Sequence, residues 1–181
     1  DRIVSNVGRR IWRCYRRESQ VIHPPVAVDS FYHKPAGDYF LIVSELVPYK
    51  RIDQAVRVFA QSGRKLRIVG DGPEYARLQR LARPNIESFG KVPGEELREL
   101  YARSRAFLMP GEEDFGITAV EALASGKPVI ALGRGGVLES VPRDPLGGVF
   151  YAEPNDSELE AAVARFEEIE PVIDPGALRR H

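Results

Sequence analysis

The feature that most constrains the fold of this chain is a regular alternation of short apolar runs with amphipathic segments between residues 38 and 166. Continuous apolar runs are typical of strands covered on both faces in a parallel sheet, and apolar residues at helical spacing are typical of the covering helices. After the first run, for example, Ile52, Val56 and Phe59 recur on one helical face. The runs predicted as strands are residues 39–44, 65–70, 86–89, 106–109, 128–132 and 148–151.

Strands that alternate with helices across short connections indicate repeated βαβ units. We therefore expect an α/β fold, a Rossmann-like parallel sheet flanked by helices. Such sheets bind ligands at the carboxyl ends of their strands, so the segments that follow the strands are expected to form one site. These segments are residues 45–50, 70–73, 91–94, 111–118 and 134–136.

The two ends of the chain are expected to lie outside this domain. Residues 1–37 are predicted to form an N-terminal helix and a linker, residues 38–170 the Rossmann-like domain, and residues 171–181 a tail that has no clear partner and frays. Because the chain opens without Met, we expect a piece of a longer protein.

Composition and charge limit the classes of partner and the cellular location that we expect. The formal net charge is zero, so no nucleic acid partner is expected, and the basic residues 9–17 are predicted as a surface helix with one apolar stripe. No apolar run is long enough to span a bilayer, and no signal-peptide pattern opens the chain. Together with the single Cys14, these features favour the cytoplasm, with the inner face of a membrane as an option for the longer protein.

The stretch from Pro110 to Pro128 passes through an acidic turn and enters a helix. A helix N-terminus presents unpaired N–H groups and the positive end of the dipole, which favour an anion. Glu113 and Glu121 would repel that anion, so we expect them to serve uncharged groups such as sugar hydroxyls. The combination indicates a ligand that contains both phosphate and sugar.

Each of these acids also has a plain structural interpretation. Thr118 and Glu121 have the spacing of a capping box, in which Thr118 is the N-cap and Glu121 reaches back to its N–H group. Glu113 has no capping role, and its alternative is a solvated loop carboxylate. Lys50, just after the first strand, has the reach to contact a diphosphate, or else it is an ordinary exposed lysine.

Other nucleotide and metal motifs are incomplete. The segment that begins at Gly70 has the first two glycines of a dinucleotide fingerprint, but Tyr75 stands where the third is required. The Gly-Lys-Ser/Thr ending of a P-loop is absent from the sequence, and one Cys with three scattered His residues forms no ligand spacing. We therefore expect no metal and no cofactor.

Several stretches in this order and spacing resemble a known family. The most specific stretch, residues 113–122, looks like an E-x7-E signature, and residues 47–53, 69–73, 89–92 and 135–139 support it. From about Val21 to Phe166 the chain resembles the C-terminal, nucleotide-sugar-binding domain of retaining glycosyltransferases of family 4 (group 1). That family has the two-domain GT-B fold, and the sequence of these stretches is closest to mannosyltransferase-like members.

The resemblance implies a role for each matching position. The donor would be a nucleoside diphosphate sugar, with GDP-mannose favoured, bound without metal. Glu113 would contact the donor sugar and Lys50 would neutralise the leaving diphosphate, as the candidate catalytic pair. The implied donor-binding set is Glu121 at the ribose, the backbone amides of Phe115, Gly116, Ile117 and Thr118 at the sugar and diphosphate, Lys91 and Val92 at the base, and Gly70 and Glu45 at the same edge.

Glu45 departs from the family, which usually has arginine there. At about 4 Å and an effective dielectric constant near 20, a repulsion of this kind is on the order of 4 kcal/mol before screening. Three explanations stay open: Glu45 pairs with Lys50 or Arg51 in the empty site, it weakens the binding of the diphosphate, or the position was altered deliberately.

The resemblance also implies a second domain. In the family, an N-terminal domain holds the acceptor, here a saccharide or a lipid-linked one, and without it the chain is expected to bind nucleotide but to transfer no sugar. A non-catalytic nucleotide- or sugar-binding module and another GT-B enzyme, such as a sugar-nucleotide epimerase, stay open as alternatives.

Overall fold

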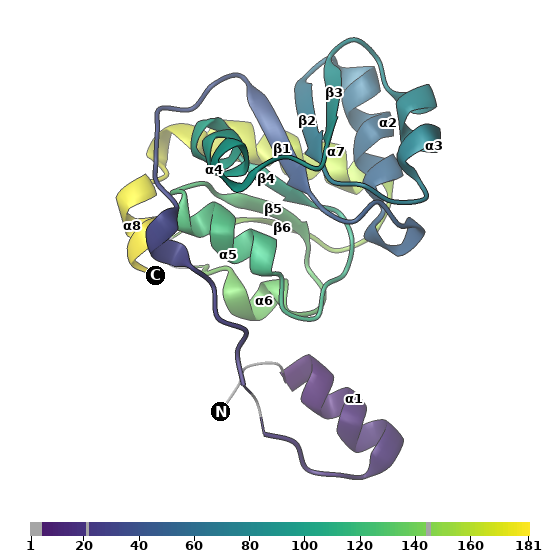
Figure 1. Cartoon of the computed structure of the whole chain (residues 1–181), viewed down its shortest axis with the longest axis vertical. Helices are drawn as coiled ribbons and strands as arrows, with labels where there is room; N and C mark the ends of the chain where they lie inside the picture. Colours follow the sequence, from purple (N-terminus) through teal and green to yellow (C-terminus); the bar gives the residue numbers. More distant parts are fainter. Residues whose placement is uncertain (1–4, 21, 144–145) are drawn as a thin grey trace.

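The computed structural model describes residues 5–20, 22–143 and 146–181. Residues 1–4 of the expected N-terminal segment and Val21, where the resemblance begins, lie outside these ranges. The predicted α/β fold is confirmed: the strands form a six-stranded parallel sheet in the order β3-β2-β1-β4-β5-β6 (Figure 1). The strands are β1 (Tyr39–Val43), β2 (Lys65–Val69), β3 (Ile86–Gly90), β4 (Phe107–Met109), β5 (Val129–Leu132) and β6 (Gly148–Tyr151).

The order of the strands defines where a ligand can enter. From β1 the chain builds outward through β2 to β3, then returns to place β4 on the other side of β1, where Leu41 pairs with Phe107. The direction of winding therefore reverses between β1 and β4. In open α/β sheets, the crevice outside the carboxyl ends of two such strands is the usual ligand site.

Helices cover both faces of the sheet because successive strand residues point to opposite sides. On β1, Phe40 joins one core cluster and Leu41 the other. The first cluster lies under α2 (Ile52–Ser62), α3 (Tyr75–Leu81) and α7 (Asp156–Ile169). The second lies under α4 (Gly94–Arg103), α5 (Ile117–Ala124), α6 (Val137–Ser140) and α8 (Pro175–Arg180).

Aromatic rings fill the centre of each cluster. In the first, the Phe40 ring meets those of Phe59 and Phe166 edge-on, at centroid distances of 5.2 and 5.7 Å. In the second, the buried Tyr101 ring packs against Phe31 and Phe107, at 5.7 and 5.6 Å. Edge-on aromatic pairs stabilise a fold beyond what the burial of apolar area contributes, so both faces of the sheet are well packed.

The N-terminal helix α1 (Ser5–Tyr15) is a surface helix, as expected. Figure 1 shows it standing apart from the layered body. Trp12 is 49% exposed and Tyr15 is 73% exposed. The Arg10 guanidinium donates two hydrogen bonds, of 2.8 and 3.1 Å, to the Asp114 carboxylate. Within the described residues, no helix is long and apolar enough to cross a membrane.

The prediction that residues 171–181 fray is wrong. A short turn, Glu170–Val172, leads into α8, which is capped where Asp174 accepts a hydrogen bond from Gly176 N at 2.8 Å. Leu178 is buried in the second core cluster, and Arg179 donates to the carbonyl oxygens of Phe31 and Ala124. Sequence patterns missed this docking because the partners are distant in the chain.

Candidate functional site

A hollow of about 530 Å³, which we call the polar hollow after the charged side chains of Glu45, Asp71 and Lys91 in its lining, opens at the carboxyl ends of the strands. Its lining comes from the loops after β1, β2 and β3 and from the start of α5: Val43, Ser44, Glu45, Val69, Gly70, Asp71, Gly72, Lys91 and Thr118. A narrower recess adjoins it at Thr118, between the loops after β1 and β4, and includes Lys50, Gly111 and Glu113. The predicted convergence of the strand-end segments on one edge is therefore confirmed.

Two glycines allow the loops of this edge to approach one another. Gly70 has φ +136°, and a Cβ atom there would lie 1.8 Å from the carbonyl oxygen of Ser44. Gly136 lies against the acidic loop, where a Cβ atom would be 2.2 Å from the carbonyl oxygen of Asp114. Its N–H group donates to the Glu113 carbonyl oxygen at 2.7 Å. The second loop thus fixes the backbone that carries Glu113.

Lys50 and Glu113 form an ion pair across the switch point of the sheet. Lys50 ends the turn Pro48–Lys50 after β1, Glu113 follows β4, and the Lys50 ammonium donates to Glu113 Oε1. The two side chains are only 13% and 26% exposed. The Lys50 ammonium also lies 5.1 Å from the centroid of the Tyr49 ring. The candidate catalytic residues are thus direct neighbours, although they are far apart in the sequence.

The start of α5 differs from the predicted capping box. The helix begins at Ile117, its N-cap is Gly116 at φ +83°, and no side chain caps it. Thr118 is therefore already helical, and Glu121 does not reach back to it. Gly116 adopts a left-handed backbone conformation, which favours glycine over the polar residues that usually occupy an N-cap. The N–H groups of Ile117 and Thr118 have no intrahelical acceptor, whereas those of Ala119 and Val120 donate to the Gly116 carbonyl oxygen, and Thr118 lines the recess.

Glu121 is held from a neighbouring helix instead. The Tyr101 hydroxyl, on α4, donates to Glu121 Oε2 at 3.0 Å and lies 3.3 Å from the Thr118 carbonyl oxygen. Burial raises the pKa of Glu121, and the bond from Tyr101 opposes that rise. Burial, reinforced by the charge of Glu121, raises the pKa of Tyr101 well above its ordinary value, so the phenol stays protonated. No local motif in the sequence assigns this role to Tyr101, because its partner Glu121 is on another helix.

The remaining candidates are divided between the hollow and the core. Lys91 is exposed and lines the hollow, whereas Val92 packs against the second core cluster. Glu45 is exposed at the hollow. It does not pair with its expected partners, because Lys50 binds Glu113 and the Arg51 guanidinium donates to the Pro154 carbonyl oxygen. The structure thus leaves the Glu45 charge facing the space where a ligand would enter.

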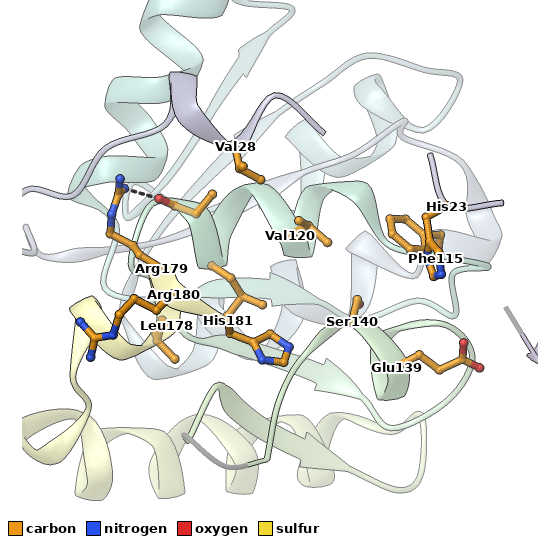
Figure 2. A pocket seen from close by; sticks show the side chains of 12 residues that line it. His23, Val28, Phe115, Val120, Glu139, Ser140, Leu178, Arg179, Arg180 and His181 are labelled. Atoms are coloured by element: carbon orange, nitrogen blue, oxygen red, sulfur yellow. Dashed lines mark hydrogen bonds between the residues drawn. The ribbon is translucent and has the colours of Figure 1, made fainter. Parts of the chain in front are cut away.

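A second hollow, of about 520 Å³, lies on the other side of α5 and is mainly apolar (Figure 2). Figure 2 shows the His23 and Phe115 rings together at one end and the end of α8 at the other. The ring centroids of His23 and Phe115 are 5.6 Å apart. The Phe115 side chain therefore faces this groove rather than the polar hollow. The groove had no sequence signal, because its walls come from residues 23–28, α5, α6 and α8.

In the part of the chain that the structure describes, no group of three or more His, Cys, Asp or Glu residues is arranged to hold a metal ion. The architecture, a Rossmann-like sheet with a polar site at its switch point, is that of GT-B glycosyltransferases. Sucrose-phosphate synthase from Thermosynechococcus elongatus has a similar structure, with a TM-score of 0.76 at 22% identity over 98% of this chain and 50% of that one.

Sequence comparison establishes the family. The family described as "Glycosyl transferases group 1" matches residues 30–178, and the chain belongs to it. A GDP-mannose-dependent alpha-mannosyltransferase of Mycobacterium tuberculosis is 39% identical over 67% of this chain and 32% of its own length. A sulfoquinovosyl transferase of Arabidopsis thaliana is 36% identical over 52% of this chain and 19% of its own. The chain thus spans a third or less of these curated relatives.

Proposed function

We propose that this chain is the C-terminal, donor-binding half of a retaining glycosyltransferase that uses a nucleoside diphosphate sugar. The observation that carries the proposal is the pairing of Lys50 with Glu113 at the switch point, beside the N-terminus of α5, in a chain of this family. A cation and helix amides suit a diphosphate, and a carboxylate suits the hydroxyls of a sugar joined to it.

Each residue has a defined task in this proposal. Lys50 and the amides of residues 116–118 stabilise the negative charge that develops on the departing diphosphate. Glu113 accepts hydrogen bonds from the donor sugar. Its pairing with Lys50 supports this role, because a sugar and the phosphate joined to it would need neighbouring partners. Glu121 accepts from the ribose hydroxyls. Lys91, which lines the hollow, lies on the side of the base, and Val92 packs behind it against the second core cluster.

The favoured donor is GDP-mannose. Its support is the similarity to mycobacterial relatives named as GDP-mannose-dependent alpha-mannosyltransferases. The plant relative is named for a different sugar, so family membership alone does not choose the donor. We further propose that transfer needs no metal. It does need a second domain, which would hold a saccharide or lipid-linked acceptor and exclude water from the reacting atoms.

Thermal stabilisation by a panel of nucleoside diphosphates and sugar nucleotides tests donor binding. A ligand that binds only the folded state stabilises it by about 2.7 kcal/mol at one hundred times its Kd. We expect GDP and GDP-mannose to raise the melting temperature more than the uridine and adenosine equivalents. Absence of a shift with every member of the panel would overturn the proposal, and a preference for UDP or ADP would overturn the choice of donor.

The exposed Glu45 favours a second candidate, a non-catalytic module that binds nucleotide or sugar. A carboxylate at the hollow repels a diphosphate, and a module that binds a less charged ligand would tolerate it. Fusing the chain to the N-terminal domain of a related mannosyltransferase and assaying sugar transfer separates the two. Turnover supports the transferase, whereas binding of nucleotide without turnover in the fused protein supports the module.

A further inference from the structure

We propose that Tyr101 is a positioning residue of the nucleotide site, whose hydroxyl holds the Glu121 carboxylate so that its other oxygen is presented to the ribose hydroxyls. The inference rests on the proposed function and deepens it, because it assigns a task to a residue that touches no ligand itself. Helices α4 and α5, which carry the two residues, lie side by side on one face of the sheet (Figure 1).

Tyr101 is a rigid support. Its side chain is fully buried, and its ring is fixed by edge-on contact with Phe31 and by the neighbouring ring of Phe107. From this anchor the hydroxyl reaches Glu121 Oε2 at 3.0 Å. A phenol on a two-torsion side chain confines its acceptor more tightly than a flexible cation would, so the direction of the Glu121 carboxylate is set by the core.

The chemistry of the bond leaves the carboxylate fit to bind a diol. Burial raises the pKa of Glu121 and the bond from Tyr101 lowers it, and among the residues that the structure describes no lysine or arginine forms an ion pair with it. A lysine or arginine in place of the phenol would neutralise the charge and compete for both oxygens. The neutral phenol occupies Oε2 alone, so Oε1 keeps its lone pairs. A half-buried carboxylate without a cationic partner costs stability, and a ligand whose hydroxyls complete its hydrogen bonds recovers part of that cost.

The competing interpretation is that Tyr101 only fills the core. The variant Tyr101→Phe separates the two, because phenylalanine keeps the ring and its packing and removes only the hydroxyl. Tyr39→Phe is the matched control. Tyr39 is also a buried tyrosine of the second core cluster, but its hydroxyl donates to the Leu100 carbonyl oxygen at 2.8 Å and not to a carboxylate.

The measurement is the Kd of GDP and of 2′-deoxy-GDP and 3′-deoxy-GDP, by calorimetry, for the chain and the two variants. One of the two deoxy compounds lacks the hydroxyl that contacts Glu121, and we expect its Kd for the wild type to be about tenfold higher than that of GDP. In Tyr101→Phe this preference falls to about twofold, while Tyr39→Phe retains it. Loss of the bond also removes the influence that lowers the pKa of Glu121. As the pH is lowered, Tyr101→Phe is therefore expected to lose its affinity for GDP at a higher pH than the wild type does.

Each outcome decides a different statement. If the wild type prefers GDP and Tyr101→Phe keeps the full preference and the same pH profile, Tyr101 is a core residue and the inference is overturned. If the wild type binds GDP without regard to the ribose hydroxyls, the assignment of Glu121 fails and the inference fails with it. If none of GDP, UDP and ADP binds to the wild type, the proposed function itself is overturned; if UDP or ADP binds in place of GDP, its deoxy analogues are used in the same test.

Discussion

Two hollows of nearly equal volume, about 530 and 520 Å³, lie on either side of α5. The polar hollow is built by loops at the ends of parallel strands and receives Thr118 from the helix. The apolar groove is built by packed helices and receives Val120 and Leu123 from the same helix. Volume therefore does not distinguish the two. Charged side chains line both, Glu45, Asp71 and Lys91 in the first and Glu139, Arg179 and Arg180 in the second. The difference is that only the first lies at the carboxyl ends of the parallel strands, where the direction of winding reverses.

The two sides also differ in what they do for the folded state. Around the groove, residues such as Leu178 bury apolar area and stabilise the fold. On α5, one turn after Thr118 of the polar hollow, Glu121 is a half-buried carboxylate whose raised pKa marks a cost in stability. We expect such a loss of stability where the carboxylate serves to bind a ligand. The comparison therefore predicts that substitutions at the groove change the stability of the fold, whereas substitutions on the side of the strand ends change the binding of the ligand.

The largest effect is expected from Leu178→Ala at the groove. Removing this buried side chain is expected to lower the free energy of unfolding by about 2–5 kcal/mol, because a cavity replaces its packing. The Kd of GDP, measured well below the melting temperature, is expected to stay unchanged. Val172→Ala, on the same tail but 77% exposed, is the control and is expected to have little effect in urea unfolding. A large loss of GDP affinity in Leu178→Ala would break the comparison.

On the polar side, Lys50→Ala is expected to weaken GDP binding by about thirtyfold, since it removes a charge-assisted contact and leaves Glu113 unpaired near the phosphates. Calorimetry measures the effect. Lys65→Ala is a suitable control, because it removes the same charge from an exposed pair with Asp38 at the start of β2. Equal GDP affinities in the two variants would show that Lys50 is not a diphosphate ligand.

Glu45→Arg sharpens the assignment of the polar hollow. We expect GDP affinity to rise about tenfold, because an attraction replaces a repulsion that is screened at this exposed position. The gain is expected to shrink at high salt and to be absent for guanosine. Glu168→Arg, an exposed change of the same charge on α7, is the control for net charge. The idea that Glu45 weakens diphosphate binding is refuted by an unchanged affinity.

The smallest effect is expected in the melting temperature of Glu121→Gln and in its dependence on pH. The pKa of Glu121 in the folded state is raised above the ordinary 4.5, so its protonation stabilises the fold at low pH and this stabilisation is lost as pH rises through the raised value. We therefore expect Glu121→Gln to melt slightly higher than wild type at pH 7, with the difference vanishing toward pH 4. Affinity for GDP is expected to fall. A lower melting temperature at pH 7 would mean that the carboxylate stabilises the fold.

Several site predictions failed or were incomplete for reasons beyond local sequence. The capping box of Thr118 and Glu121 is locally well formed, yet Gly116 starts the helix and Tyr101 takes the Glu121 carboxylate. The cap of α7 shows the opposite case. Asn155, immediately before the helix begins at Asp156, accepts from Glu158 N at 2.9 Å, which is the local N-cap that such a sequence specifies. Local patterns find elements well and side-chain partners poorly.

The sequence by itself determined the elements, the parallel α/β class and the set of loops that gather at one edge. Periodicity of apolar residues encodes which stretches are strands or helices, and short connections force the strands to run parallel. Only the tertiary structure decided that Lys50 meets Glu113, that α8 packs against α5 and that Tyr101 holds Glu121. Those contacts depend on the order β3-β2-β1-β4-β5-β6, which places residues distant in the chain side by side. No local pattern in the sequence specifies that order.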